Sequence, residues 1–260
     1  MGHMEHFGAG WVSPVLAYAM ACVGAALGLR CTMRALEASG RSRRNWLLTA
    51  SLAIGTGIWT MHFIAMLGFS VVGSPIRYDV LGTVASLLVA VLVVGVGVFM
   101  VGYGRDRNRS LVLGGLGTGL GVAAMHYLGM AAVKLHGRVT YNPVLVTLSV
   151  IIAVVAATAA LWAALNVTAA RGVWIASLVM GLAVSSMHYT GMTAVQIHLT
   201  AGRAALSGAS AMKFIFPLAV GLGSFLFLTA AFVALSPTAR EREASAAVTN
   251  PHPRSELPTA

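Results

Sequence analysis

Long apolar segments alternate with short polar ones along almost the whole chain. A helix that crosses a lipid bilayer needs ~20 mainly apolar residues, and seven segments reach this length. They lie at about residues 13–33, 46–68, 79–102, 111–133, 143–166, 172–195 and 213–235. The first segment is as long as the others and leads directly into the second, so we interpret it as a retained helix rather than a cleaved signal peptide. The pattern predicts an all-α fold, a polytopic membrane bundle of seven transmembrane helices.

The second, fourth and sixth segments share the motif Met-His-x-x-x-Met. Its histidines are His62, His126 and His188, which are 64 and 62 residues apart. Repetition at a nearly fixed period indicates a structural unit that is copied along the chain. We therefore predict one membrane domain, residues 1–235, followed by a disordered tail that is rich in proline and polar residues. The predicted boundaries are about 10–68, 78–133 and 141–195 for three two-helix repeats, about 213–235 for a seventh helix, and 236–260 for the tail.

The composition supports a membrane location and determines how the net charge is interpreted. Hydrophobic residues make up 58% of the chain and charged residues only 9%, whereas about a quarter of the residues of soluble domains are charged. The net charge of +10 would indicate nucleic-acid binding only if it formed a basic face on a soluble fold, so we exclude that class. The 17 lysines and arginines instead fall in alternating loops, twelve on one side and five on the other. The positive-inside rule then predicts an N-terminus outside the cell and a C-terminus in the cytoplasm.

Helical geometry relates the motif residues to one another. Residues four apart share a helix face, so His62 and Met66 project together, while Met61 lies ~100° away and flanks that face. The same holds for the other two copies. A glycine stands seven residues before each histidine, and a small residue three after it: Gly55, Gly119 and Gly181, then Ala65, Gly129 and Gly191. Small residues allow neighbouring helices to approach closely, so we expect the imidazoles and thioethers to point into the bundle, in the outer third of the membrane.

An imidazole beside a thioether in this setting predicts a metal site. The two donor types together favour copper, Cu(I) in particular, whereas zinc is normally held by cysteine, histidine or carboxylate. The alternative interpretation is packing, with methionine as a core filler and histidine hydrogen-bonded to a carbonyl. Three copies of an ionisable residue at matched depth in a membrane favour function.

Other aromatic and histidine residues near the motifs have a more ordinary interpretation. The aromatic residue after each motif histidine is interpreted as an interfacial anchor. His136 and His198 are interpreted as loop residues, with a role as supplementary metal ligands as the alternative, and His6 is a further weak candidate. The three aromatic residues are Phe63, Tyr127 and Tyr189.

The third copy of the motif, Met187-His188-Tyr189-Thr190, resembles the MHYT sensor domain of bacterial integral membrane proteins, over roughly residues 10–235. That family is described with seven spans, three repeats and a proposed copper site that senses oxygen, carbon monoxide or nitric oxide. The resemblance implies a location in the bacterial cytoplasmic (inner) membrane. The first repeat departs from the motif at Phe63 and Ala65. The candidate metal ligands that the resemblance implies are Met61, His62, Met66, Met125, His126, Met130, Met187, His188 and Met192.

We therefore expect a membrane sensory or signalling module that binds copper and senses a diatomic gas, and not an enzyme. Because no catalytic domain follows the seventh segment, we expect its output to pass through a membrane or cytoplasmic signalling partner. The remaining partners expected are the lipid bilayer and the gas itself, with no nucleic acid. Two alternatives stay open, namely a copper transport or delivery protein and a haem-binding membrane redox protein.

Overall fold

The computed structural model describes residues 4–5, 10–167, 169–200 and 205–236. Within these residues, seven helices are long and apolar enough to cross a membrane. They are α1 (Val12–Glu37), α2 (Gly40–Leu67), α3 (Val80–Tyr103), α4 (Arg107–Ala131), α5 (Pro143–Asn166), α6 (Ala170–Thr193) and α7 (Ile215–Leu235). The predicted all-α fold with seven transmembrane helices is confirmed, and each helix overlaps its predicted segment. The predicted tail lies outside the described residues, apart from residue 236.

Three of the helices begin at a side chain that caps the backbone. The Asp79 carboxylate accepts a hydrogen bond from the Gly82 amide at the start of α3, and Asp106 and Asn142 cap α4 and α5 in the same way. Such a cap satisfies backbone N–H groups that have no partner within the helix. The caps thereby fix where both helices of the second repeat and the first helix of the third repeat begin.

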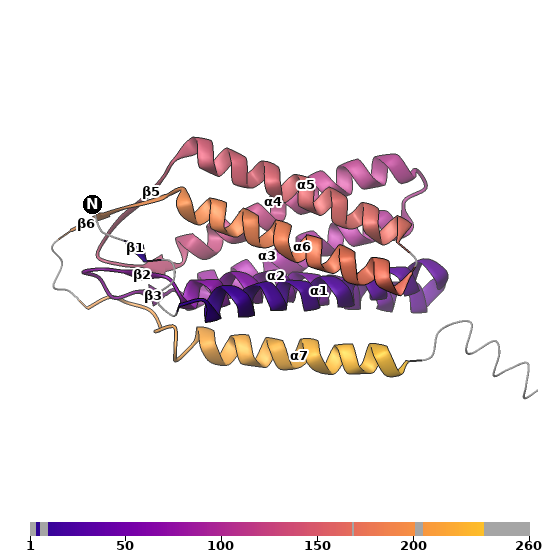
Figure 1. Ribbon diagram of the computed structural model, residues 1–260, viewed down its shortest axis with the longest axis horizontal. Helices are drawn as coiled ribbons and strands as arrows, with labels where there is room; N and C mark the ends of the chain where they lie inside the picture. Colours follow the sequence, from indigo (N-terminus) through magenta and orange to yellow (C-terminus); the bar gives the residue numbers. More distant parts are fainter. Residues whose placement is uncertain (1–3, 6–9, 168, 201–204, 237–260) are drawn as a thin grey trace, which may run out of the picture.

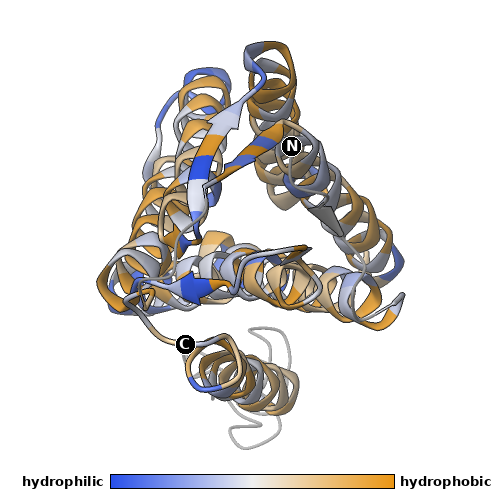
Figure 2. Cartoon of the chain, turned by 90° about the vertical axis from the view of Figure 1, so that its left-hand side faces the viewer, coloured by the Kyte–Doolittle hydropathy of each residue, from blue (hydrophilic) through white to orange (hydrophobic). Residues whose placement is uncertain are grey.

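Six helices form a closed ring, and the seventh lies outside it. Each of α1 to α5 contacts the next helix along the chain, and α6 returns to contact α1. A view along the bundle shows these helices as the three sides of a triangle, with α7 against one side (Figure 2). That side is formed by the first repeat, because α7 packs on α2 and α1. The three repeats therefore have equivalent places in the ring, whereas α7 packs on the side of the first repeat.

Short strands connect the repeats at one end of the bundle (Figure 1). They form three two-stranded antiparallel sheets, which the sequence did not predict. Strands that follow α2 and α4 pair as β3 with β4, and strands that follow α4 and α6 pair as β5 with β6, so the C-terminal ends of the motif helices are linked. The pairs are β1 (Met4–Glu5) with β2 (Ser70–Val71), β3 (Arg77–Tyr78) with β4 (Val133–Lys134), and β5 (Gly137–Tyr141) with β6 (Val195–Leu199).

The glycine seven residues before each motif histidine lies where two repeats meet. A Cβ atom at Gly55 would lie 2.7 Å from the Cα atom of Val91 on α3, a separation that real Cβ atoms essentially never show. The two other glycines face the following odd-numbered helix in the same way, with α6 facing α1. The pairs are Gly55 with Val91, Gly119 with Val154 and Gly181 with Cys22. The expected role of these glycines in close helix approach is thus observed, at the contacts that close the ring.

Candidate metal centre

The three motif histidines meet in the middle of the ring. His62 on α2, His126 on α4 and His188 on α6 each lie five residues before the last residue of their helix. All three side chains are buried. One ring nitrogen from each lies within 4.8 Å of those of the other two, and this is the only such group of histidine, cysteine or acidic residues among the described residues. One side chain from each repeat thus contributes to a single centre.

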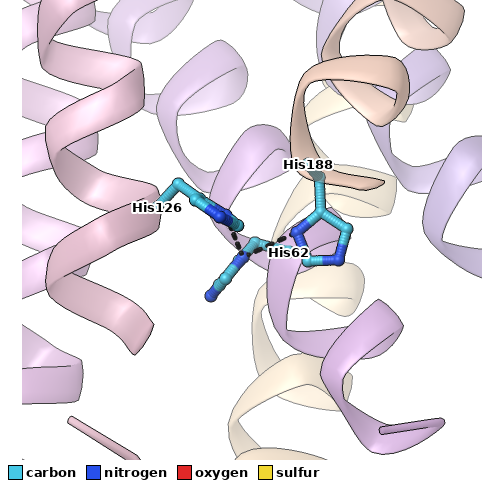
Figure 3. Close-up of side chains that lie close together, drawn as sticks. All are labelled: His62, His126 and His188. Atoms are coloured by element: carbon cyan, nitrogen blue, oxygen red, sulfur yellow. Dashed lines mark hydrogen bonds between the residues drawn. The ribbon is translucent and has the colours of Figure 1, made fainter. Parts of the chain in front are cut away.

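The nitrogens that face one another are the Nδ1 atoms. His62 Nδ1 lies 3.0 Å from His188 Nδ1 and 3.2 Å from His126 Nδ1, so the His62 ring is the middle member (Figure 3). A neutral imidazole carries one N–H and one lone pair. When the proton is on Nε2, the Nδ1 lone pairs of His126 and His188 both lie close to that of His62, an arrangement that a bound cation would stabilise.

The separation of these nitrogens fits a metal centre. Metal–imidazole bonds of ~2.0–2.1 Å at angles of ~110–120° place neighbouring ligand nitrogens about 3.3–3.6 Å apart. The observed 3.0 and 3.2 Å approach this range, so shifts of a few tenths of an ångström would complete the site. The donors are three neutral imidazoles, a set that suits copper, zinc, iron and nickel. The imidazole rings are in direct contact, which leaves no space for a macrocycle between them and disfavours haem.

The small residue three positions after the histidine makes room for the imidazole of another repeat. A Cβ atom at Gly129 would lie 2.7 Å from His62 Nε2, and one at Gly191 would lie 2.5 Å from His126 Nε2. Both Nε2 atoms are buried and have no hydrogen-bond partner. These two glycines thus allow the close approach expected of small residues on this face, and what approaches them is an imidazole ring of another repeat.

The aromatic residues after the histidines pack edge-on against the imidazole rings. The ring centroids of His62 and Phe63 are 4.6 Å apart, and the pairs in the other two repeats are 4.8 and 5.0 Å apart. Phe63 is fully buried and also contacts Trp59. Its interpretation as an interfacial anchor is therefore wrong, because burial in the core outweighs any preference for the interface. Tyr127 and Tyr189 are half-buried, and the Tyr127 hydroxyl forms a 2.6 Å hydrogen bond with Ser149.

All six motif methionines are buried, and they line the surroundings of the histidines. Met61 packs with Ala17 and Ala21 of α1, on the flank where helical geometry had placed it. Met187 lines a cavity inside the ring. The remaining four belong to the main hydrophobic core, namely Met66, Met125, Met130 and Met192. The imidazoles of His62, His126 and His188 form the group of converging nitrogen donors, and the role of the methionines as metal ligands stays a prediction.

The additional histidine candidates lie away from this group. His198 is part of β6 and pairs with Arg138 of β5. The backbone amide of His136 donates to the Ser74 hydroxyl in the loops at the same end. Neither belongs to the histidine group. His136 lies in a loop, as predicted, whereas His198 lies in a strand, and His6 falls outside the described residues.

Two tyrosines that precede the odd-numbered helices were not predicted as part of the site. Tyr78 packs against Phe63, and its hydroxyl donates to the Met66 carbonyl at 3.4 Å. Tyr141 packs in the same way against Tyr127. Burial raises the pKa of both phenols above the ordinary value, and the nearby Tyr127 raises that of Tyr141 further, so both stay neutral. The signal in the sequence was their equivalent position in two repeats.

Comparison with known proteins identifies a family and several relatives of this chain. The MHYT family model, described as a bacterial signalling protein N-terminal repeat, matches residues 55–114 and 119–177. His62 and His126 fall within these matches, and the structure adds His188.

Three curated relatives illustrate the similarity. The bifunctional diguanylate cyclase/cyclic di-GMP phosphodiesterase MucR of Pseudomonas aeruginosa is 43% identical over 171 residues, which cover 64% of this chain and 25% of the relative. The cyclic di-GMP phosphodiesterase NbdA of the same species is 36% identical over 195 residues, 72% of this chain and 24% of the relative. The signalling protein YkoW of Bacillus subtilis is 30% identical over 190 residues, which cover 70% of this chain and 24% of the relative. The matched region thus spans about a quarter of each relative's length, and no solved structure matches the chain.

Proposed function

The chain belongs to the MHYT family of bacterial signalling proteins, and from this premise we propose that it is a membrane sensory module whose three histidines bind copper and whose sensed ligand is a diatomic gas. Seven apolar helices and this family indicate a multi-pass protein of the inner membrane. The observation that carries the proposal is the convergence of three buried Nδ1 atoms, one from each repeat.

Copper suits this centre better than harder cations for two reasons. The converging donors are uncharged imidazole nitrogens, and no carboxylate belongs to the group among the described residues, whereas calcium and magnesium require oxygen ligands. The surrounding methionines are soft and polarisable, which favours Cu(I). Copper held by three protein ligands would supply an open coordination position for a gas molecule.

The arrangement of the helices suggests how ligand binding at the three histidines would be transmitted through the bundle. His62, His126 and His188 connect α2, α4 and α6, so any change in their spacing changes the packing of the ring. α2 also packs directly on α7, which lies outside the ring. At the far end of α7, the Ser236 carbonyl accepts a 2.9 Å hydrogen bond from Arg34 of α1. A ligand shifts such an equilibrium only by its differential affinity for two packing states, and we propose that α7 reports that shift.

The orientation and the output belong to the same proposal. The excess of basic residues in the loops opposite the strands favours an orientation with the strands and the metal centre near the exterior. The names of MucR and NbdA refer to cyclic di-GMP synthesis and breakdown. We propose that this module regulates a signalling partner of that kind.

The metal content of the full chain tests the copper proposal. We expect stoichiometric copper in detergent-purified protein, and its loss on His62→Ala, His126→Ala or His188→Ala. The matched controls are His136→Ala and His198→Ala, which remove histidines outside the group and should retain copper. Absence of copper from the wild type, or equal copper content in all five variants, would refute the metal site.

The gas proposal has a separate test. Reduced, copper-loaded protein should change its absorption or infrared spectrum when carbon monoxide or nitric oxide is added, and the three motif variants should not. An unchanged spectrum of the loaded wild type refutes gas binding and leaves the metal site standing. Accumulation of copper inside liposomes that contain the protein would instead favour the transport alternative.

A further inference from the structure

An apolar cavity of about 50 Å³ lies inside the ring, among residues of all six helices. Ile58, Val122 and Val184 line it, and each stands four residues before a motif histidine. Because residues four apart lie one helical turn from each other on the same face, these three side chains separate the cavity from the imidazoles. Met187, which precedes His188, lines the cavity as well. The cavity and the metal centre therefore share a wall made by all three repeats.

The cavity exists because α5 presents small side chains to the centre of the ring. One face of α5 contributes Ala153, Ala157 and Ala160 to the lining, together with other residues of that helix. The second repeat has Val94 at the position that corresponds to Ala157, since Val91 and Val154 occupy matching places against the glycines of α2 and α4. Ala157 lacks the two additional methyl groups of valine, and this leaves space beside α5 that Val94 fills beside α3.

The chemistry of the lining excludes water as a natural occupant. A buried water needs two to four polar partners, whereas apolar cavities stay dry and accept molecules such as xenon. The lining is almost entirely aliphatic. Of its two threonines, Thr32 donates its hydroxyl hydrogen bond to the Gly28 carbonyl, and Thr118 is buried with no partner. One hydroxyl is too few to hold a water, while the volume is several times the ~10–15 Å³ that a water-sized molecule requires.

We propose that this cavity is a binding site for a small apolar molecule of the size of a diatomic gas. Such molecules dissolve in the hydrocarbon of the bilayer, so a site inside the ring draws them from the membrane rather than from the aqueous exterior. Binding in the cavity is independent of any metal. Its second role, to hold the gas one helical turn from the histidines, rests on the function proposed above.

Xenon binding to metal-free protein tests the cavity directly. The full chain is purified in detergent, stripped with a chelator and titrated with xenon, and the xenon NMR signal is followed. Ala157→Leu places three additional carbon atoms in the cavity, and Ala159→Leu makes the same change at an exposed position two residues further along α5. We expect a saturable shift for the wild type and for Ala159→Leu, and its loss for Ala157→Leu. Equal titrations of the two leucine variants, with folding verified by circular dichroism, would overturn the proposal.

Two further variants keep the test decisive if Ala157→Leu fails to fold. Ala157→Val introduces the side chain that the second repeat carries at the corresponding position, and should weaken xenon binding severalfold. Thr118→Val removes the unpartnered hydroxyl with little change of shape and should bind xenon as the wild type does. A wild-type titration for Ala157→Val, or a loss of binding for Thr118→Val, contradicts a site defined by apolar volume.

The role in gas supply is measured separately on copper-loaded protein. Carbon monoxide should react more slowly with Ala157→Leu than with Ala159→Leu, although both bind copper equally. Equal reaction rates of the two variants with carbon monoxide would overturn the role in gas supply. Whether the cavity binds apolar molecules would then be decided by the xenon titration alone. Failure of the protein to bind copper would refute the proposed metal site without altering the xenon titration.

Discussion

Gly129→Ala should damage the metal centre while leaving the rest of the bundle in place. The added Cβ atom would lie 2.7 Å from His62 Nε2, 3.2 Å from its Cδ2 and 3.3 Å from Phe63 Cζ. Ordinary contact begins at 3.4 Å, so His62 Nε2 must move by about 0.7 Å. The His62 ring is the middle member of the triad, with both Nδ1 contacts. Metal sites tolerate displacements of only about 0.5 Å, so we expect the metal affinity to fall.

The magnitude follows from two effects. Extra volume in a packed core typically costs about 1–3 kcal/mol, and disturbing the residues that orient metal ligands typically lowers metal affinity by about 10–100-fold. The matched control is Gly117→Ala, an exposed position on the same helix where the new Cβ would have no neighbour within 4 Å. Because alanine is the better helix former by about 1 kcal/mol, the control should be neutral or slightly stabilising.

Competition with a Cu(I) chelator and thermal unfolding in detergent measure both effects. We expect Gly129→Ala to bind copper at least tenfold more weakly than Gly117→Ala and to unfold at a lower temperature. Gly191→Ala, which meets His126 Nε2 at 2.5 Å, should behave like Gly129→Ala. Copper affinity equal to that of the control in both variants would show that the small residues after the histidines do not position the rings.

Two further predictions concern stability. Ser86→Ala leaves the indole N–H of the buried Trp59 without its 2.9 Å partner, so the free energy of unfolding should fall by about 1–3 kcal/mol; Ser224→Ala on an exposed face of α7 should change it by less than about 0.5 kcal/mol, and equal thermal shifts would contradict this. Asp79→Ala removes the cap of α3, whose carboxylate accepts from the Gly82 amide at 2.7 Å, at a cost of about 0.5–2 kcal/mol. Asp79→Asn supplies the residue type that caps α5 and should retain most of the stability, whereas a loss as large as that of the alanine variant would point to a role of the charge.

The sequence predicted the features that depend on local periodicity. Apolar length marks the seven helices, and duplication reveals the matched depth of His62, His126 and His188. The orientation of the histidines toward the interior followed from small residues at helical spacing. These features are local because a helix and the thickness of a bilayer constrain residues that are close in sequence.

The features that the sequence did not predict depend on long-range packing. The contact between Nδ1 atoms requires the ring to close through α6 and α1, which are far apart in the chain. The strands were not predicted because some contain only two residues and pair with distant segments. Such strands are too short for an alternation of apolar and polar residues to be recognised. α2 begins at Gly40 rather than residue 46 because a turn with Arg43 and Arg44 continues the helix beyond the apolar segment. The cavity was not predicted because the alanines of α5 form no distinctive pattern in the sequence. Their effect becomes visible only when Ala157 is compared with Val94, the residue at the equivalent position of the second repeat.

The ring brings one histidine from each repeat into a single group, so the three repeats depend on one another. Copies of a unit usually allow one copy to vary while another maintains the function. Here each repeat supplies a third of one centre, so no repeat is a spare, and a mutation in any of them acts on all three. The three motif helices are therefore coupled to one another through this group, whereas α7 lies outside the ring and packs on the first repeat.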